Sequence, residues 1–164
     1  MHPPLAALPR FETQRLTIMP LTMADADAVT SLTDDVAITG VVHFLPSPFT
    51  RLDAEALIDQ NGNDTCFLGA LFQDQLVGIV GLHARGDDRL EIGYWIGTKF
   101  QRRGYAGEAV SGTIDVLKNR YPTRRVIAEC RPCNDASWTL LQKLGFRATG
   151  LQADRPGREL LALE

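Results

Sequence analysis

A short turn that combines glycine with two arginines is the part of this sequence best suited to chemistry. Gln101, Arg102 and Arg103 lead into Gly104. Residues with the spacing of one helix face follow the turn at Ala106, Ala109, Val110, Thr113, Ile114, Leu117 and Tyr121. A helix that begins at or near Gly104 directs unpaired backbone N–H groups and the positive end of its dipole into this turn. A phosphate or diphosphate would bind there, and the absent side chain of Gly104 would let it lie directly against the backbone.

Two well-known phosphate-binding loops do not match this turn. The P-loop of nucleotide hydrolases needs Lys-Ser or Lys-Thr after a glycine-rich run, and the chain has neither in that context. The glycines between Gly93 and Gly107 lack the spacing of the dinucleotide fingerprint. The alternative interpretation is a solvated, arginine-rich helix start, because helix openings with Gly and Arg are common.

The turn resembles the first signature of a known family. Residues 101–106 resemble the Gln/Arg-x-x-Gly-x-Gly/Ala motif of the GNAT superfamily of acetyl-coenzyme A dependent N-acetyltransferases. Residues 134–146 resemble its second signature, Asn-x-x-Ser-x-x-Leu-Leu-x-Lys-x-Gly-Phe. Residues 11–21 resemble the first strand of the branch that acetylates ribosomal-protein N-termini at alanine or serine, and residues 44–50 resemble its proline-rich link into the second helix. These segments follow the family's order and span nearly the whole chain.

The resemblance implies a fold and a co-substrate. The fold would be a single α/β domain of the GNAT type, with a mixed, mostly antiparallel sheet of about six or seven strands and about four helices. The sheet would splay open between the strand at 90–96 and the strand at 125–130 to admit the pantetheine arm of acetyl-coenzyme A. Backbone groups of Trp95 and Ile96 would hold the pantetheine amides and the oxyanion, and Asn134 would hold the cofactor or its water. The turn that would bind the rest of the cofactor consists of Gln101, Arg102, Arg103, Gly104, Tyr105 and Ala106.

Acetyl transfer to an amine requires a neutral amine, a site for the oxyanion and stabilisation of the departing thiolate. A lysine side chain, with a pKa of about 10.4, needs more help to lose its proton than an α-amine at about 7.7 to 8.0. We expect Glu91 to be the base, directly or through water, with His83 as the second candidate. The alternatives are a carboxylate that orients a neighbouring strand for Glu91 and a core or rim histidine for His83.

The thiolate needs a different hydrogen-bond donor. Many GNAT enzymes place a tyrosine seven residues after the motif asparagine, and this chain has Leu141 there. The ribosomal-protein branch tends to use a serine where Ser137 lies, so we expect Ser137 to donate to the sulfur as charge develops. The alternative roles of Asn134 and Ser137 are an N-cap and a polar residue of the first helical turn.

The loop at 41–49 is expected to shape the amine pocket. It is rich in apolar residues and proline, and binding groups are often displayed on loops. Its candidate substrate contacts are His43, Phe44 and Leu45.

Composition places the chain among ordinary globular proteins. Its 164 residues, 45% hydrophobic and 23% charged, fit one domain over 11–164 with one core. Residues 1–10 contain three prolines and no charged segment before an apolar block, so we expect a flexible arm rather than a secretory signal. The apolar runs are far shorter than the roughly 20 residues of a membrane helix, so no membrane partner is expected.

The net charge of −3 argues against broad nucleic-acid binding. Acidic residues concentrate in the first half of the chain and arginines in the second. A basic cofactor side and an acidic substrate side would suit a polyanionic cofactor and a cationic amine. Charge on solvated helices is the alternative explanation.

Cys130 and Cys133 form a Cys-x-x-Cys motif, which suggests a redox pair as a rival function. The chain after Cys133 is too short for the rest of a thioredoxin-like domain. Cys66 and the three histidines provide no second closely spaced ligand pair, so no metal is expected. Reduced structural thiols, and hence a cytoplasmic setting, are the preferred interpretation.

Local patterns predict the elements that must position these residues. Seven strands are expected at 15–20, 65–72, 75–84, 89–96, 126–130, 148–152 and 159–163. Thr22 with Asp25, and Thr50 with Asp53, have the capping-box spacing of a helix start. The strand–helix–strand order between 90 and 130 favours a parallel pair, so the sheet should be mixed.

The sequence therefore predicts an N-acetyltransferase that uses acetyl-coenzyme A and acetylates a primary amine, either a protein α-amine or a small molecule, by direct attack on the thioester. The alternative is a non-catalytic acyl-coenzyme A binding or sensing module. The identity of the amine and the oligomeric state stay open, with a homodimer among the alternatives.

Overall fold

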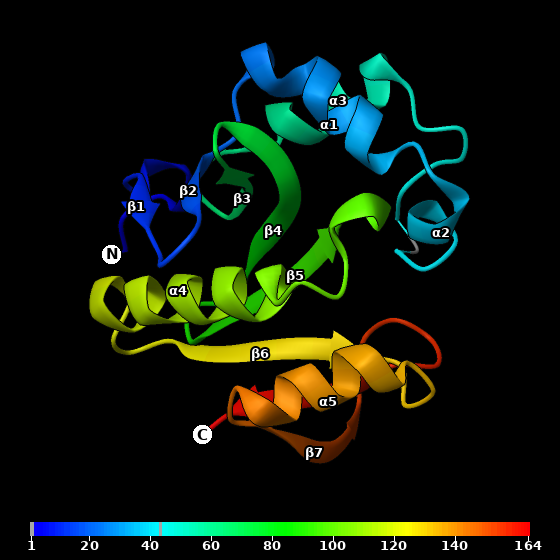
Figure 1. Ribbon diagram of the computed structural model, residues 1–164. Helices are drawn as coiled ribbons and strands as arrows, with labels where there is room; N and C mark the ends of the chain where they lie inside the picture. The colour runs from blue at the N-terminus through cyan, green and yellow to red at the C-terminus, as the bar shows by residue number, and fades with distance from the viewer. Residues whose placement is uncertain (1, 43) are drawn as a thin grey trace.

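The computed structural model describes residues 2–42 and 44–164. Within these residues, one eight-stranded sheet has the order β1-β2-β3-β4-β5-β6-β8-β7 (Figure 1). The strands are β1 (Phe11–Glu12), β2 (Thr17–Pro20), β3 (Thr65–Phe72), β4 (Gln75–Arg85), β5 (Arg89–Ile96), β6 (Arg125–Cys130), β7 (Phe146–Gln152) and β8 (Glu159–Leu163). The β5–β6 pair is parallel, and the other pairs are antiparallel. The predicted mixed sheet is confirmed.

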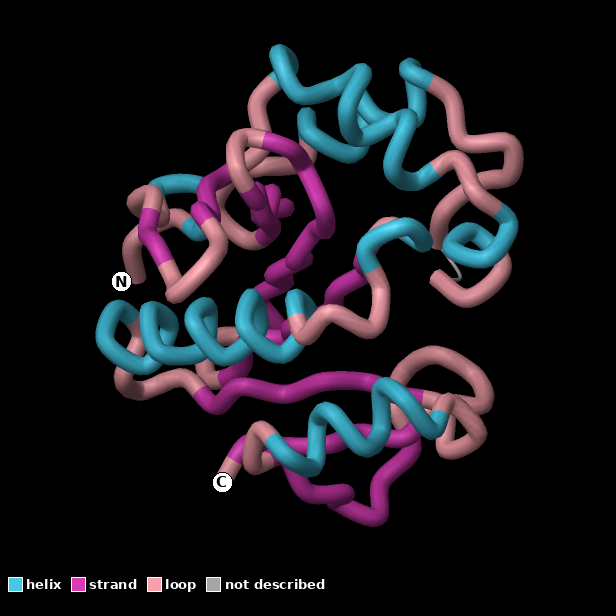
Figure 2. Tube along the Cα trace, viewed as in Figure 1, coloured by secondary structure: helices cyan, strands magenta, loops and turns pink. Residues whose placement is uncertain are grey.

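Five α-helices and three short 3-10 helices complete the described residues. They are α1 (Ala26–Thr33), α2 (Val36–Thr39), α3 (Arg51–Asp59), α4 (Tyr105–Arg120) and α5 (Asp135–Lys143), with η1 (Leu5–Ala7), η2 (Met23–Asp25) and η3 (Thr98–Phe100). Figure 2 shows α1 to α3 grouped apart from α4 and α5, with the central strands between the two groups.

Alternating residues of the central strands enter two separate cores. On β4, Ile79 packs in the core with α1 and α3, whereas its neighbour Val80 packs in the core with α4. On β3, Phe67 likewise packs in the core with α1 and α3, and Leu68 packs in the core with α4. The sheet is therefore covered on both faces, which explains why β3 and β4 are nearly continuous apolar runs.

The sheet opens between β5 and β6. The two strands pair only at their beginnings, where Arg89, Leu90 and Glu91 face Arg125, Val126 and Ile127. Beyond Glu91 they diverge, and β6 continues in partnership with β8 (Figure 1). The predicted opening between these two strands is confirmed, and it leaves the C-terminal half of β5 available on this side.

The fold has more elements than the sequence indicated. The strand β1 and the helix α2 raise the counts, within the described residues, to eight strands and five α-helices. Both are too short, at two and four residues, to produce a recognisable hydrophobic period. The capping boxes at Thr22 and Thr50 are both present, but the first of them begins η2, a 3-10 turn that precedes α1.

The N-terminal segment is packed rather than loose. Leu5 and Leu8 are buried in the core with α4, and the Leu5 N–H donates to the carbonyl of Asn63 at 3.1 Å. The Tyr121 hydroxyl donates to the carbonyl of Pro3 at 3.0 Å. The prediction of a flexible arm is therefore wrong for residues 2–10, because apolar side chains between the prolines bury against the domain. No helix in the described part of the chain is long and apolar enough to cross a membrane.

Candidate active site

The turn before α4 has the backbone of a ligand cradle. Gly104 is the N-cap of α4 and has a φ of +83°, a left-handed conformation that suits glycine. The first turn of α4 leaves N–H groups without intrahelical partners on this side. The Gln101 amide donates to the carbonyl of Ile96 at 3.0 Å, which ties the turn to the end of β5. A helix start with this geometry suits an anion.

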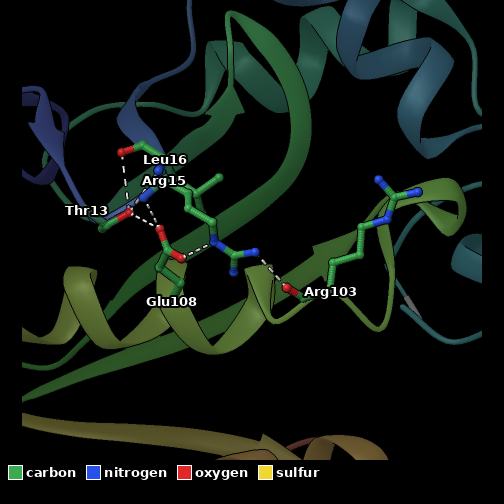
Figure 3. A network of polar contacts seen from close by, with 5 residues as sticks. All are labelled: Thr13, Arg15, Leu16, Arg103 and Glu108. Carbon is green, nitrogen blue, oxygen red and sulfur yellow. Dashed lines mark hydrogen bonds and ion pairs between the residues drawn. The ribbon is translucent and has the colours of Figure 1, made fainter.

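A network from the N-terminal part of the chain supports the turn (Figure 3). Arg15 forms an ion pair with Glu108 at 2.7 Å and donates to the carbonyl of Arg103 at 2.9 Å. The Thr13 hydroxyl donates to the same carboxylate at 2.5 Å. Burial opposes the ionisation of Glu108, but the hydrogen bonds from Thr13 and Arg15 outweigh it and lower the pKa of Glu108. Glu108 thus stays charged and holds Arg15 against the turn.

A groove of about 580 Å³ begins at this turn and runs along the end of β5 to the start of α5. Its lining includes every predicted cofactor residue except Arg103: Trp95, Ile96, Gln101, Arg102, Gly104, Tyr105, Ala106 and Asn134. The side chain of Arg103 is exposed, and its carbonyl accepts from Arg15. The groove thus has lining residues both at the turn before α4 and at the opening of the sheet.

A second, smaller cavity of about 110 Å³ lies beside the groove. Its walls include Phe44, His83, Glu91 and Gly93. The groove and the cavity share Val41, Val42, Tyr94, Trp95, Asn134 and Ser137 as lining residues. They therefore meet where β5 and β6 part.

Tyr94 and Ser137 share a hydrogen bond of 2.9 Å at this meeting point. The Asn134 side chain accepts from the Ser137 backbone N–H at 3.3 Å, so Asn134 is the N-cap of α5. Burial raises the pKa of Tyr94, despite the opposing effect of the Ser137 hydroxyl. Tyr94 therefore remains a neutral donor at neutral pH. Tyr94 was not among the residues predicted from the sequence. Strand alternation places it on the opposite face of β5 from Glu91 and Trp95.

The carboxylate of Glu91 is buried and paired with two arginines. Arg85 donates to one oxygen at 2.7 Å, and Arg155 lies 3.3 Å from the other. His83 is the cross-strand neighbour of Glu91. Burial lowers the pKa of His83, and the charge of Glu91 offsets this only in part, so the ring is neutral at neutral pH. The two predicted bases are thus adjacent in the cavity, but the Glu91 carboxylate is already engaged.

A second carboxylate, that of Glu129 on β6, was not foreseen. Its side chain is 6% exposed and lies 3.3 Å from Arg155, which thereby bridges Glu129 and Glu91 across the opening of the sheet. Burial and the charge of Glu91 raise the pKa of Glu129. The sequence does contain one sign of Glu129, a charged residue in the middle of an apolar strand. It contains no sign of the pairing with Arg155, which is distant in sequence from both carboxylates.

The residues predicted to line the amine pocket do not all lie in the same place. Phe44 lines the cavity, with its ring 6.0 Å from that of Trp95. Leu45 is instead buried in the core with α1 and α3, and it lines neither the groove nor the cavity. His43 lies outside the described residues.

The cysteines are free thiols, with Cys66 and Cys130 buried and Cys133 exposed. Burial raises the pKa of Cys66 to about 12 and also raises that of Cys130. Both therefore stay protonated at neutral pH, unlike the thiolates of redox motifs. Within the described residues, no three His, Cys, Asp or Glu side chains gather as a metal site would require.

Comparison with known proteins agrees with this geometry. Residues 15–147 match the acetyltransferase (GNAT) domain family. The chain is 31% identical over 143 residues to the uncharacterised N-acetyltransferase YnaD of Bacillus subtilis, covering 84% of this chain and 82% of that protein.

Solved structures share the fold. A GNAT-family acetyltransferase from Bacillus anthracis matches with a TM-score of 0.81 at 24% identity, covering 94% of this chain and 98% of that one. RimL, a ribosomal L7/L12 α-N-protein acetyltransferase in complex with coenzyme A, matches with a TM-score of 0.83 at 16% identity, covering 94% and 97%. The chain belongs to the GNAT family of acetyltransferases and is an N-acetyltransferase of this type.

Proposed function

We propose that this protein transfers the acetyl group of acetyl-coenzyme A to a primary amine by direct attack of the amine on the thioester. The observation that carries the proposal is the junction of the groove and the cavity at Tyr94 and Ser137. A thioester that enters along the groove and an amine that enters the cavity would meet there. Such an arrangement makes the reaction effectively unimolecular.

The turn at 101–106 and the end of β5 are suited to coenzyme A. The diphosphate would lie at the start of α4, where the helix dipole and free N–H groups favour an anion. Backbone groups of Trp95 and Ile96 would bind the pantetheine amides and the developing oxyanion. The coenzyme A complex of RimL, which has the same fold, supports this assignment.

We assign proton removal from the amine to Glu129, acting directly or through water. Both oxygens of Glu91 are engaged by arginines, so Glu91 better serves to orient Arg155. Glu129 is made more basic by burial and by the charge of Glu91. The neutral ring of His83 is the second candidate, as the sequence indicated.

Ser137 and Tyr94 are assigned to the departing thiolate. As the amine nitrogen bonds to the carbonyl carbon and the carbon–sulfur bond breaks, the sulfur takes the proton of the Ser137 hydroxyl. Tyr94 returns a proton to Ser137 through their shared hydrogen bond. Solvent then reprotonates Tyr94 and takes up the amine proton from Glu129. This pair replaces the tyrosine that many family members place at the position of Leu141.

The direct test measures release of free thiol from acetyl-coenzyme A with a panel of primary amines, together with the mass of the acetylated product. Thiol release matched by product confirms acetyl transfer. Tight binding of acetyl-coenzyme A without thiol release across the panel would favour the binding or sensing module instead.

A further inference from the structure

Two arginines line the cavity in addition to Arg155. Arg131 follows β6, and Arg158 lies in the hairpin between β7 and β8; both line the cavity but not the groove. Among the residues that the structure describes, neither forms an ion pair with a carboxylate. Within the described residues, the Arg158 side chain makes one hydrogen bond, from Nη2 to the carbonyl of Val41 at 3.3 Å, which leaves most of its five donors available.

The charges around the cavity are unbalanced. Two carboxylates, Glu91 and Glu129, face three lining arginines, Arg131, Arg155 and Arg158. Arg155 bridges both carboxylates, so the excess positive charge lies at the other two arginines. Burial, together with the charges of Arg155 and Arg131, lowers the pKa of Arg158, although Glu129 opposes this effect. The lowered pKa reflects a desolvated, incompletely neutralised guanidinium group.

This arrangement reverses the expected polarity of the acceptor site. The sequence indicated an acidic substrate side for a cationic amine, but the cavity holds more arginine than carboxylate. Guanidinium groups form paired hydrogen bonds with the planar oxygens of carboxylates and with phosphates. An entering molecule with only positive charge would be repelled, whereas a molecule with both an amine and an anion would find partners for both.

We propose that the acceptor is a small primary amine that carries a carboxylate or a phosphate, and that Arg131 and Arg158 bind this anion. The proposal rests on the proposed acetyl transfer at the same site and specifies its substrate class. The amine would lie toward Glu129 and the Tyr94–Ser137 pair, with the anion toward the β7–β8 hairpin. Polyamines and aminoglycosides would be poor acceptors.

The kinetic test compares matched acceptors. L-alanine is compared with L-alaninamide, and O-phosphoethanolamine with ethanolamine; spermidine serves as the polycation. Intrinsic reactivity favours the amide over the amino acid, because the amine of the amide loses its proton more easily. We nevertheless expect kcat/KM for at least one anionic member to exceed that of its neutral partner about tenfold or more. The pair that shows this preference distinguishes carboxylate from phosphate.

Variants identify the source of the preference. Arg158→Gln and Arg131→Gln should each reduce it severalfold, and Arg158→Lys should retain part of it. Arg147→Gln is the matched control, because Arg147 lies on β7, donates to backbone carbonyls and does not line the cavity. Equal use of charged and neutral partners by the wild type, or unchanged selectivity in both glutamine variants, would overturn the proposal while leaving acetyl transfer intact.

A binding measurement separates this proposal from the proposed function. Calorimetry with N-acetyl-L-alanine and its amide, and with N-acetyl-O-phosphoethanolamine and N-acetylethanolamine, requires no turnover. We expect the wild type to bind the anion of the preferred pair about tenfold more tightly than its neutral partner. In Arg158→Gln this difference should shrink severalfold, because only Arg131 remains. Equal binding within both pairs by the wild type would contradict the anion site. Preserved anion binding without thiol release would contradict only the acetyl transfer.

Discussion

Tyr94 and Ser137 come from elements on opposite sides of the sheet opening, yet their hydroxyl groups lie 2.9 Å apart. The motif position that many family members fill with tyrosine is Leu141, which is buried in the core. In the proposed mechanism, Tyr94 on β5 therefore acts on the departing sulfur from another direction. Because burial raises the pKa of Tyr94, its proton is available throughout the neutral range.

We expect Tyr94→Phe to lower kcat about tenfold or more while leaving KM for acetyl-coenzyme A within about twofold, because the proton is needed only as the thiolate forms. Ser137→Ala should lower kcat at least as much. The double variant should be no slower than Ser137→Ala alone, since the two hydroxyls act in series. Steady-state kinetics with saturating amine measures these effects.

Tyr121→Phe is the matched control for these variants. Its buried hydroxyl donates to the carbonyls of Pro3 and Pro4, away from the groove and the cavity. Its loss should leave kcat unchanged. Additive effects of Tyr94→Phe and Ser137→Ala would contradict the relay.

Glu129 should govern the acidic limb of the pH profile of kcat/KM. Only its carboxylate accepts a proton, so activity should rise as pH increases through its raised pKa, below the limb set by the amine itself. Glu129→Gln should remove this limb and lower kcat/KM about 100-fold. Glu91→Gln should retain the limb but move it to lower pH, because the negative charge that raises the pKa of Glu129 is gone. An unchanged acidic limb in Glu129→Gln would transfer the role of base to His83.

The turn between β5 and α4 is built from local features that a sequence displays directly. Gly104, the N-cap of α4, has a left-handed φ that suits glycine, and the Gln101 amide donates to the carbonyl of Ile96. The network from Thr13 and Arg15 to Glu108 holds this turn from outside. The turn is thus held by hydrogen bonds and an ion pair from another part of the chain.

Gly104→Asp should abolish detectable binding of coenzyme A, because a carboxylate would lie where the diphosphate is expected. Calorimetric titration with coenzyme A measures the loss. Gly150→Asp is the matched control: Gly150 has a φ of +79° and open space around it on β7, so it carries the same backbone strain away from the groove. If Gly104→Asp binds coenzyme A as tightly as Gly150→Asp does, the cradle is assigned to the wrong ligand.

The prediction from sequence succeeds where short-range patterns decide the structure. The strands β3 and β5 and the capping box at Thr50 follow from residues close together in the chain. The sequence also groups most residues that line the groove, because they cluster at one strand end and two helix starts. The arrangement of the cavity could not be predicted from the sequence. Arg155 meets Glu91 and Glu129 only because β8, which follows it, pairs with β6. The role of Leu45 was wrong for the same reason, since its place in the core depends on how α1 and α3 pack.

The N-terminal segment connects distant parts of the molecule. Residues 2–10 pack under α4 and against the turn before β3, and residues 13–15 hold the start of α4. The same stretch of chain thus contributes both to the core and to the cofactor cradle. Its removal should affect stability and coenzyme A binding together.

Leu5→Ala should lower the free energy of unfolding by about 2 to 5 kcal/mol, since Leu5 is fully buried and its truncation leaves a cavity. Urea denaturation measures the change. Leu151→Ala is the control, because Leu151 is 63% exposed and its truncation should cost almost nothing. Equal stabilities of the two variants would show that the segment contributes nothing to the core.

Arg155 joins the β7–β8 hairpin to both margins of the sheet opening, whereas the cradle at Gly104 is braced from the opposite end of the chain. The proposed donor site and the proposed acceptor site are therefore supported by separate segments of the chain. Exchange of the hairpin at 153–158 between homologues offers a route to new acceptor preferences that leaves recognition of the acetyl donor untouched. Under the proposed function, substrate range in this scaffold could diversify through the six residues of this loop, without change to the helix start proposed to bind the donor.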